Sequence, residues 1–523
     1  MKVALRLKVF IPPLVILLFA VCASFINLDV FLSYTTAINN WILDNFSWLF
    51  SGGSLLMVLT LLVVFISPLG KWRLGGETAQ PLLTKWRWGS ITICTTTAAG
   101  MLFWGTAEPL YHLYSPPVSL NLEPASAESA RFALSTMFMH WSITPFAIYA
   151  VPALAFALAF YNNNGNFSLS SAIEPVLGKK ASANFGGVID SLAMFALVAG
   201  MASSLGTGAL VLASGISKVT GIGNNIVLLG VVIFAIMICF VASSVSGLQK
   251  GIARLSSVNT LVFVAIAILA FVFGPTASIV EGASIAFIDY MTNYIPRSLS
   301  LSFSSDDKWP QWWTVFYWAN WLAWAPVVAL FLGKIARGYT VRQFIIINWF
   351  VPASFSIIWM AIFSGTILEL DQSQNGYFWN ILQESGPGAV IYGLLEQLPG
   401  GTFLVTLFIG VVFLAYVTAA DSNTEAISEL CIGKSVSEED SLPAKRRLKV
   451  LWGALIASIA WIMTGFSGVD GIKMMSNLGG FPALVVVILM TLALSKWIWL
   501  SMPSHKHESA HTLNTLHVPE NGE

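Results

Sequence analysis

The chain has 523 residues, of which 56% are hydrophobic and 10% are charged, and its mean hydropathy is +0.75. Soluble domains carry about 25% charged residues, and a globule of this length could not cover so much apolar surface, so the composition excludes a soluble protein and indicates a polytopic membrane protein. The formal net charge is zero, with no basic patch outside short loops, which gives no indication of a nucleic-acid partner.

Segments long enough to cross a bilayer recur along the whole chain. A hydrocarbon core of about 30 Å requires about 20 apolar residues per helix, and this measure predicts about twelve spans. The spans lie near 10–30, 49–68, 89–110, 132–161, 187–216, 225–247, 252–275, 309–335, 343–368, 402–431, 448–467 and 474–499. Two further segments, about 279–297 and 388–399, are expected at the membrane interface. The first span has no small-residue cleavage site, so it is interpreted as a retained helix rather than a signal peptide.

Lysine and arginine in the short loops set the expected orientation. With the N-terminus inside, about 21 of the 26 basic residues fall in cytoplasmic segments, among them the cluster from Lys445 to Lys449. The remaining ones are Arg131, Lys218, Arg297, Lys308 and Lys473. Both termini are therefore expected in the cytoplasm.

Cysteine and histidine spacing gives no indication of a disulfide, a zinc site or an enzyme. No CxxC or CxxH spacing exists, and the cysteines are expected to pack as small apolar side chains within the spans. The histidines of the membrane region are His112 and His140. Neither is expected to have a metal-ligating partner at i+3 or i+4, which counts against a metalloenzyme.

Span three, "ITICTTTAAGMLFWGTAEPLYHL", combines a run of threonines with Gly100, Gly105 and Pro109. This composition is poorly suited to a continuous lipid-facing helix, and unwound backbone at membrane depth is tolerated only inside protein or beside a water-filled cavity. Transporters use such breaks to bind ions and substrates. The alternative is that the small residues allow helices to pack closely, and the segment alone does not decide between the two.

Aromatic side chains crowd spans four and eight. Span four contains "HWSITPFAIYAVPAL", which Pro145 and Pro152 are expected to interrupt, and span eight contains "WWTVFYWANWLAWAPVVALFLGKIARG". In span eight Tyr317, Trp321 and Trp324 stand at i, i+4 and i+7, on one stripe of a helix, and they continue too deep for an interfacial belt. Aromatic faces of this kind bind quaternary ammonium groups, and an aromatic packing seam is the alternative.

The segment "WWTVFYWANWLAWAPVVALFLGKIARGYTVRQF" resembles the signature of the betaine/choline/carnitine transporter (BCCT) family. "FWGTAEP" in span three, "HWSITPFAIY" in span four and "TAADS" in span ten resemble family landmarks in the same order. The resemblance covers all the predicted spans. It implies an all-α membrane fold with a five-plus-five inverted-repeat core, spans 3–7 and 8–12, after two extra helices.

The same resemblance implies a function and a location. It implies a homotrimer in the bacterial inner membrane, surrounded by lipid, that carries trimethylammonium-type solutes by alternating access and is not an enzyme. A channel or a structural subunit is the alternative from another class. Neither terminus carries the long charged extension of osmosensing members, so constitutive uptake is expected.

The resemblance divides the chain into five parts. They are an N-terminal segment with two peripheral helices (1–88), a first repeat (89–275), an extracellular amphipathic connection (276–308), a second repeat (309–500) and a cytoplasmic tail that is expected to be disordered (501–523).

Carried over position by position, the resemblance implies a set of substrate-binding residues. The box for the substrate cation corresponds to Trp141, Phe146, Tyr149 and Trp321, with Tyr111 as a further wall, Trp318 and Trp324 along the passage below, and Asn320 beside Trp321. Phe146 and Asn320 depart from the pattern, because the family commonly has Trp at both positions. Asn320 can donate and accept hydrogen bonds, which favours a substrate with an extra polar group or a smaller headgroup. A helix–helix hydrogen bond is the alternative role of Asn320.

The predicted break in span three carries no acidic residue. Its register reads Thr96, Ala98, Gly100, where the family commonly has alternating glycines, so the backbone has less conformational freedom. A cation such as choline would find no counter-charge there. This favours zwitterions such as betaines or carnitine.

The resemblance also implies a sodium site. In sodium-coupled members carbonyls of span three join side chains of spans seven and ten, and the matching positions are Cys94, Thr97, Asn259 and Thr418. Ion-independent exchangers of the family have arginine at the position of Asn259, and a neutral amide cannot replace the ion. Ala419 stands where sodium-coupled members have serine, so one ligand is missing and the predicted site is weak.

Proton coupling and exchange of a related compound remain alternatives to sodium. Three carboxylates of the membrane region, Glu108, Asp421 and Glu425, are candidates to carry a proton. A helix-end or interhelical hydrogen bond is the alternative role of each. No cofactor besides the coupling ion is expected.

Overall fold

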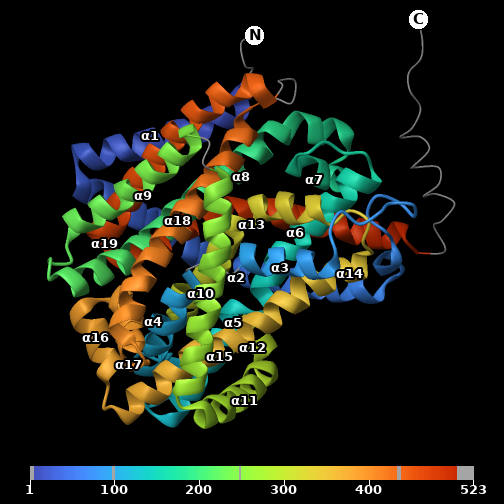
Figure 1. Ribbon diagram of the computed structural model, residues 1–523. Coiled ribbons are helices and arrows are strands. Elements are labelled where there is room, and N and C mark those ends of the chain that lie inside the picture. Colours follow the sequence, from blue (N-terminus) through green and yellow to red (C-terminus); the bar gives the residue numbers. More distant parts are fainter. Residues whose placement is uncertain (1–4, 97–99, 247–248, 433–437, 503–523) are drawn as a thin grey trace, which may run out of the picture.

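The computed structural model describes residues 5–96, 100–246, 249–432 and 438–502, and this part of the chain is almost entirely helical (Figure 1). It contains no strand, although two isolated bridges join Leu5 to Ile432 and Arg73 to Thr340. The all-α membrane fold expected from the sequence is therefore confirmed.

Short connections join most of the helices. As far as Phe273 they are α1 (Leu7–Ile26), α2 (Leu28–Ile66), α3 (Lys85–Thr96), α4 (Gly100–Tyr114), α5 (Ala127–Trp141), α6 (Ile143–Asn162), α7 (Leu169–Leu177), α8 (Lys179–Thr220), α9 (Ile226–Ser246) and α10 (Gln249–Phe273). After it they are α11 (Thr276–Thr292), α12 (Tyr294–Ser298), α13 (Phe316–Ile335), α14 (Val341–Ile345), α15 (Val351–Ser373), α16 (Tyr377–Ser385), α17 (Val390–Gln397), α18 (Gly401–Cys431) and α19 (Glu438–Leu500). Single turns are η1 (Pro68–Lys71), η2 (Val118–Leu120), η3 (Gln311–Val315), η4 (Ile346–Phe350) and η5 (Pro387–Ala389).

Within the described residues, nine helical segments are long and apolar enough to cross a membrane, and the bent pair α10–α11 brings the number to ten. The difference from about twelve has two sources. Span three is divided between α3 and α4, which are both short, and spans eleven and twelve are joined in α19, which bends at Gly468 with φ +55°. About twelve crossings remain when these segments are counted separately. The division into repeats at 89–275 and 309–500 stays a prediction.

The fourth predicted span breaks at an unexpected residue. α5 ends at Trp141 and α6 begins at Ile143, and Ser142 between them has φ −126° and ψ −103°. The prolines expected to interrupt the span do not, because Pro145 lies in the first turn of α6, where an N–H has no helical partner, and Pro152 lies inside the same helix. The break therefore comes directly after Trp141.

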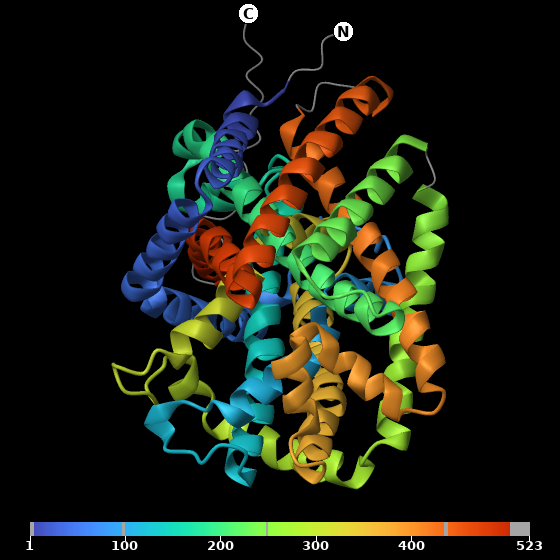
Figure 2. The same ribbon diagram turned by 90° about the vertical axis from the view of Figure 1, so that its left-hand side faces the viewer.

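α13 lies at the centre of the bundle, in contact with α6, α8 and α19 (Figure 1). Its side chains Tyr317, Trp318 and Leu322 are fully buried. The segment formed by α5 and α6 is the most completely covered, with 89% of its most apolar window buried. α1 and α2 lie along one flank, where they are drawn in blue (Figure 2), and 22% of the corresponding window of α1 is buried.

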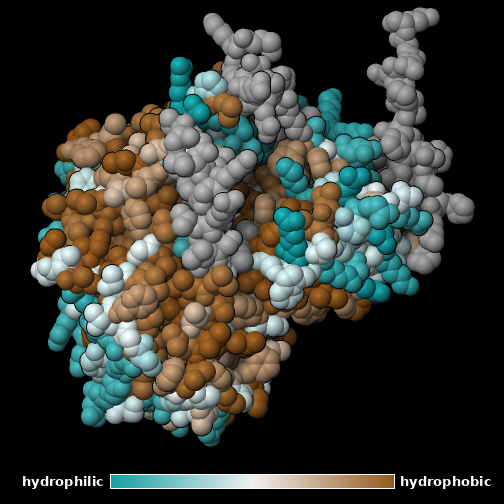
Figure 3. Space-filling model, viewed as in Figure 1, coloured by the Kyte–Doolittle hydropathy of each residue, from teal (hydrophilic) through white to brown (hydrophobic). Residues whose placement is uncertain are grey.

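A broad apolar surface covers the side of the bundle. Hydrophobic side chains cover the middle of the face formed by α9, α10 and α15, and hydrophilic side chains gather at its lower end (Figure 3). Exposed apolar residues of α9 and α10 include Val227, Val231, Ile238, Leu261 and Val272. A continuous apolar surface of this kind is unfavourable in water, so this face contacts lipid and the chain is an integral membrane protein.

Loops that were assigned to one side of the membrane lie together. On the predicted cytoplasmic side, Arg73 donates to the carbonyl of Gly338 at 2.7 Å. On the opposite side, the Ser119 hydroxyl donates to Asp307 at 2.6 Å. The arrangement has two distinct ends, although which end faces the cytoplasm stays a prediction.

Candidate functional site

A cavity of about 1260 Å³ lies among α6, α8, α13 and α18. At one end its lining residues Lys334 and Glu429 are exposed, so the cavity reaches the surface on the side of the basic loops. At its deep end it is bordered by Trp104 and Phe316, which are 4% and 1% exposed. The cavity is therefore open toward one side of the bundle, and aromatic side chains close it toward the other.

Trp321 is the centre of an aromatic wall in this cavity. Its ring centroid lies 5.0–5.6 Å from those of three side chains on α5 and α6, which are Tyr149, Trp141 and Phe146. Trp141, Tyr149 and Trp321 line the cavity, and so does Trp324, one turn farther along α13. Phe146 is fully buried and is not among the lining residues. The structure thus brings together the four residues predicted as the box, with Phe146 packed against Trp321 instead of facing the cavity.

Two other predicted residues lie away from the cavity. Trp318 is fully buried, with its ring edge-on to His140 at 6.1 Å. Tyr111 packs against Trp313, 5.3 Å between centroids, one turn before Phe316. The ammonium of Lys473 lies 3.6 Å from the centre of the same Trp313 ring. These contacts form part of the packing that closes the deep end.

A buried carboxylate connects the aromatic wall to two histidines. Glu108 Oε1 accepts hydrogen bonds from His112 Nε2 at 3.0 Å and from His140 Nδ1 at 2.7 Å. Its Oε2 accepts from Trp141 Nε1 at 3.0 Å and from the Tyr317 hydroxyl. All five residues are buried. A buried charge is tolerated when its lone pairs are satisfied in this way, so the network holds α4, α5 and α13 in register.

The expectation that neither histidine has a metal-ligating partner is wrong. Glu108 stands four residues before His112, and ligand atoms of Glu108, His112 and His140 lie within 4.8 Å of one another. Within the described part of the chain, these three residues form the one cluster of His, Cys, Asp and Glu side chains that could hold a metal ion. Three of these atoms, Glu108 Oε1, His112 Nε2 and His140 Nδ1, are already hydrogen-bonded to one another without an ion, whereas His112 Nδ1 has no partner among the described residues. His140 joins the trio from another span, which spacing along one helix could not have shown.

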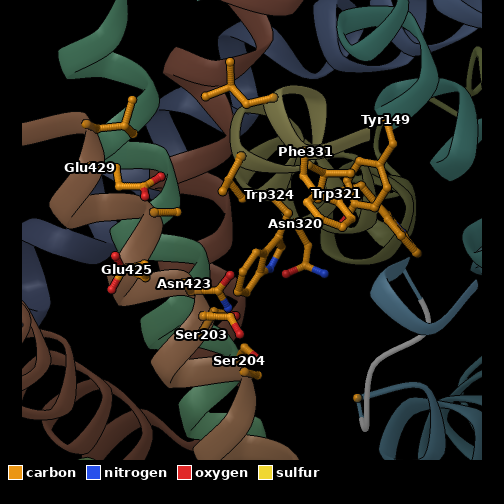
Figure 4. A pocket seen from close by; sticks show the side chains of 18 of the residues that line it. Tyr149, Ser203, Ser204, Asn320, Trp321, Trp324, Phe331, Asn423, Glu425 and Glu429 are labelled. Carbon is orange, nitrogen blue, oxygen red and sulfur yellow. The ribbon is translucent and has the colours of Figure 1, made fainter. Parts of the chain in front are cut away.

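The wall opposite the aromatic residues is polar. Ser203, Ser204 and Thr207 of α8 line it, and Asn320 of α13 borders the same space. In the view of Figure 4, Tyr149 and Trp321 lie to one side, Ser203 and Ser204 to the other, and Asn320 and Trp324 between them. The α8 serines were not among the predicted site residues. Their signal is the run "GMASSLGTG", which places hydroxyl groups among small residues inside a span.

Two of the four predicted sodium ligands lie beside the cavity. Asn259 and Thr418 both line the cavity, and Ala419 does so beside Thr418. The Thr418 hydroxyl donates to the Leu414 carbonyl at 2.7 Å, which leaves its oxygen lone pairs available. Asn259 Nδ2 has no hydrogen-bond partner among the described residues. The Thr418 hydroxyl and the Asn259 amide each carry a neutral oxygen, which is the ligand type that a hard cation needs.

The other two predicted ligands belong to span three. Cys94 lies in the last turn of α3, which ends at Thr96, and α4 begins at Gly100. Thr97 and the predicted unwinding lie outside the described residues. The contribution of their carbonyls stays a prediction.

The candidate proton carriers of α18 are held in ion pairs. Lys449 Nζ lies 2.9 Å from Asp421 Oδ1 and 2.7 Å from Glu425 Oε2. Lys445 Nζ lies 2.9 Å from Glu425 Oε1 and 3.2 Å from Glu429 Oε1. Glu425, Glu429 and Lys445 border the open end of the cavity. The charges of this end are therefore largely paired with one another.

Comparisons with known proteins agree over nearly the whole chain. Residues 8–502 match the family model described as BCCT, betaine/carnitine/choline family transporter. The chain is 32% identical over 466 residues to a protein named glycine betaine transporter 1 of Vibrio parahaemolyticus, which covers 87% of this chain and 86% of that protein. It is 30% identical over 486 residues to a glycine betaine transporter of Bacillus subtilis, covering 91% of both chains. It is 29% identical over 454 residues to an ectoine/hydroxyectoine transporter of Virgibacillus pantothenticus, covering 87% of this chain and 89% of that one.

Proposed function

Because the chain belongs to the betaine/carnitine/choline transporter family, we propose that it imports a quaternary-ammonium or related zwitterionic solute by alternating access, driven by Na⁺. The observation that carries this proposal is the aromatic wall around Trp321 inside a cavity open to one side. A desolvated quaternary ammonium gains about 2 kcal/mol or more from such a face. Relatives named for glycine betaine and for ectoine support this class of solute.

The aromatic residues have different roles in the proposal. The substrate cation lies against Trp141, Tyr149 and Trp321, and Trp324 lines its passage toward the open end. Phe146 supports the Trp321 ring from the buried side. Trp318 and Tyr111 pack around the box in this conformation and are candidates to meet the substrate when the opposite side opens.

Sodium coupling rests on the side chains of α10 and α18. Asn259 and Thr418 supply two neutral oxygens beside the cavity, and the carbonyls of Cys94 and Thr97 would complete a set of four. Exchange without an ion is less well supported, because no fixed positive charge stands at Asn259. Proton coupling through Asp421 or Glu425 is less well supported as well, because both carboxylates are ion-paired with lysine.

The proposal includes an assembly and a location. The chain forms a homotrimer within the lipid of the bacterial inner membrane, with both termini in the cytoplasm. The open end of the cavity then faces the cytoplasm, because it lies on the side of the basic loops.

Uptake into proteoliposomes tests the function. Purified full-length protein is reconstituted, and uptake of radiolabelled glycine betaine, ectoine, carnitine and choline is measured under separately imposed Na⁺ and proton gradients. Saturable uptake of at least one zwitterion that requires the Na⁺ gradient is expected. Uptake that is equal without sodium and follows the proton gradient would contradict the coupling, and no saturable uptake of any of the four would contradict the substrate class.

A further inference from the structure

A row of hydrogen bonds beside the cavity ends at Asn320, which lines the cavity. The hydroxyls of Ser203 on α8 and Ser476 on α19 lie 2.8 Å apart, and the Ser476 hydroxyl donates to Asn320 Oδ1 at 3.1 Å. The Ser476 hydroxyl also lies 3.1 Å from the Ile472 carbonyl of its own helix, so its one hydrogen is shared between that carbonyl and Asn320 Oδ1. The amide oxygen of Asn320 is thus the atom that faces the Ser476 hydroxyl.

The amide nitrogen of Asn320 is left for another partner. Asn320 is half-buried and lines the cavity, and no described residue accepts a hydrogen bond from its Nδ2. An amide nitrogen carries two donors, and a solute that displaces water from the cavity must supply acceptors for them or leave them unpaired. The fixed oxygen thus directs two N–H groups toward the cavity, where a bound solute can accept from them.

We propose that Asn320 Nδ2 forms a subsite that binds the carboxylate of a zwitterionic substrate while the aromatic wall holds its cationic group. Trp321 and Asn320 are consecutive on α13, so their side chains point about 100° apart around the helix. One faces the aromatic residues of α6 and the other faces α8 and α19. A compact solute lying across α13 therefore meets a cation-binding face and a hydrogen-bond donor at the same time.

The charges around the cavity agree with a neutral donor for the carboxylate. The basic residues that line the cavity are Arg6, Lys334 and Lys445, and all three lie at its open end. Arg6 is paired with Asp190 and Lys445 with Glu425. Among the described residues that line the deep part, a carboxylate finds neutral hydrogen-bond donors and no cation. The ammonium of Lys473, which lies on the Trp313 ring, does not border the cavity.

This subsite selects for a class of substrate. A site built to hydrogen-bond a substrate group rejects the analogue that lacks it, because its buried donors are then left unpaired. The preferred solute is therefore an amino-acid-derived zwitterion, and tetramethylammonium, which has the cation without an acceptor, is disfavoured. The inference rests on the proposed function and adds to it the group that recognises the carboxylate.

Binding measurements on Asn320 variants test the subsite. Binding of glycine betaine and of tetramethylammonium to the purified full-length protein is followed by tryptophan fluorescence. Asn320→Leu has nearly the same size and no donors, and it is expected to weaken glycine betaine at least tenfold while tetramethylammonium changes less than twofold. Asn320→Asp places a negative charge opposite the carboxylate, and it is expected to reverse the preference in favour of the cation.

Two further variants separate the possible failures. Asn166 lines the open end of the cavity, and Asn166→Leu is the matched control that should leave the ratio of the two affinities unchanged. Trp321→Ala should weaken the binding of both ligands. If the wild type binds glycine betaine and the ratio of the affinities for glycine betaine and tetramethylammonium is unchanged in Asn320→Leu and Asn320→Asp, the subsite alone is overturned. Wild-type protein that binds neither ligand would overturn the proposed function instead. A tighter glycine betaine complex in Asn320→Asp would show that the amide presents its oxygen to the cavity and would also overturn the subsite.

Discussion

At the scale of a single residue, Trp321 belongs both to the wall of the cavity and to the packed aromatic core. Its face borders the cavity, its ring packs against three aromatic neighbours, and its Nε1–H donates to the His140 carbonyl at 3.1 Å. Glu108 fixes the adjoining Trp141 from behind. The resemblance predicted the aromatic cluster from residue types. It did not predict Glu108 as its anchor, because contacts between spans leave no spacing pattern in one sequence.

Trp321→Ala should reduce the affinity for the substrate at least tenfold, because the substrate cation loses its central aromatic face, worth about 2 kcal/mol. Trp324→Ala removes a ring from the passage and should reduce the maximal rate more than the affinity. Uptake kinetics in proteoliposomes separate the two quantities. An unchanged apparent KM in Trp321→Ala would show that the substrate binds elsewhere.

Glu108→Gln should weaken substrate binding without touching the cavity. The amide has one acceptor oxygen, and its NH₂ group faces donors that the carboxylate accepted from, so hydrogen bonds to Trp141 and Tyr317 are lost at about 1–3 kcal/mol for each donor left unpaired. Thermal unfolding in detergent and glycine betaine binding are the measurements. Tyr317→Phe removes one of the same donors and should show a smaller loss of both. Equal stability and binding in Glu108→Gln and wild type would contradict the anchoring role.

The positions of most membrane-spanning helices could be predicted from the sequence, but the breaks within them could not. Apolar length placed the ends of spans eight and ten close to those of η3–α13 and α18, although α2 begins at Leu28, well before the predicted start of span two. The sequence predicted the break in span four at its prolines, but the break is at Ser142. Proline is tolerated in the first turn of a helix, and no residue pattern marks the backbone geometry of Ser142. α19 contains both of the spans predicted at 448–467 and 474–499, and Gly468, whose φ of +55° is not helical, lies between them.

The elements α10 and α18 carry the prediction on coupling. Ala419→Ser restores a hydroxyl beside Thr418 and should tighten the apparent affinity for sodium several-fold, because a site of four oxygens gains a fifth ligand. Thr418→Ala and Asn259→Ala should each abolish the dependence on sodium. Uptake measured against sodium concentration checks all three. A dependence on sodium that is the same in Thr418→Ala and the wild type would remove α18 from the site.

At the scale of the whole molecule, the cavity makes the two ends of the helical bundle different, because it is open at one end and closed at the other. It opens beside Lys334 and Glu429 and ends at Trp104 and Phe316, so the transport pathway is accessible from one side in this conformation. The orientation was predicted from charges in the loops, whereas the conformational state was not. Which end of the cavity is open depends on how the helices around it pack, and the charges of the loops carry no information on that packing.

Accessibility of Ser422 tests which end of the cavity is open. Ser422 is exposed and lines the cavity, and a cysteine there should react with a membrane-impermeant maleimide in inside-out vesicles and be protected in right-side-out ones. The exposed Cys22 and Cys239 are first replaced by serine. Val118→Cys on the opposite side, 83% exposed, is the control and should show the reverse pattern. Equal labelling of Ser422→Cys from both sides would contradict a cavity open to one side.

The contrast between α1 and the α5–α6 segment has a consequence for mutational tolerance. With 22% of its apolar window buried, α1 meets mainly lipid, whereas the corresponding window of α5–α6 is 89% buried. Lipid chains adapt to the shape of a side chain, so exchanges among leucine, valine, isoleucine and phenylalanine on the outer face of α1 should be nearly neutral. The close-packed segment penalises a change of even one methylene. After random mutagenesis and selection for uptake, functional variants should therefore carry many apolar-to-apolar substitutions in α1 and almost none in α5–α6.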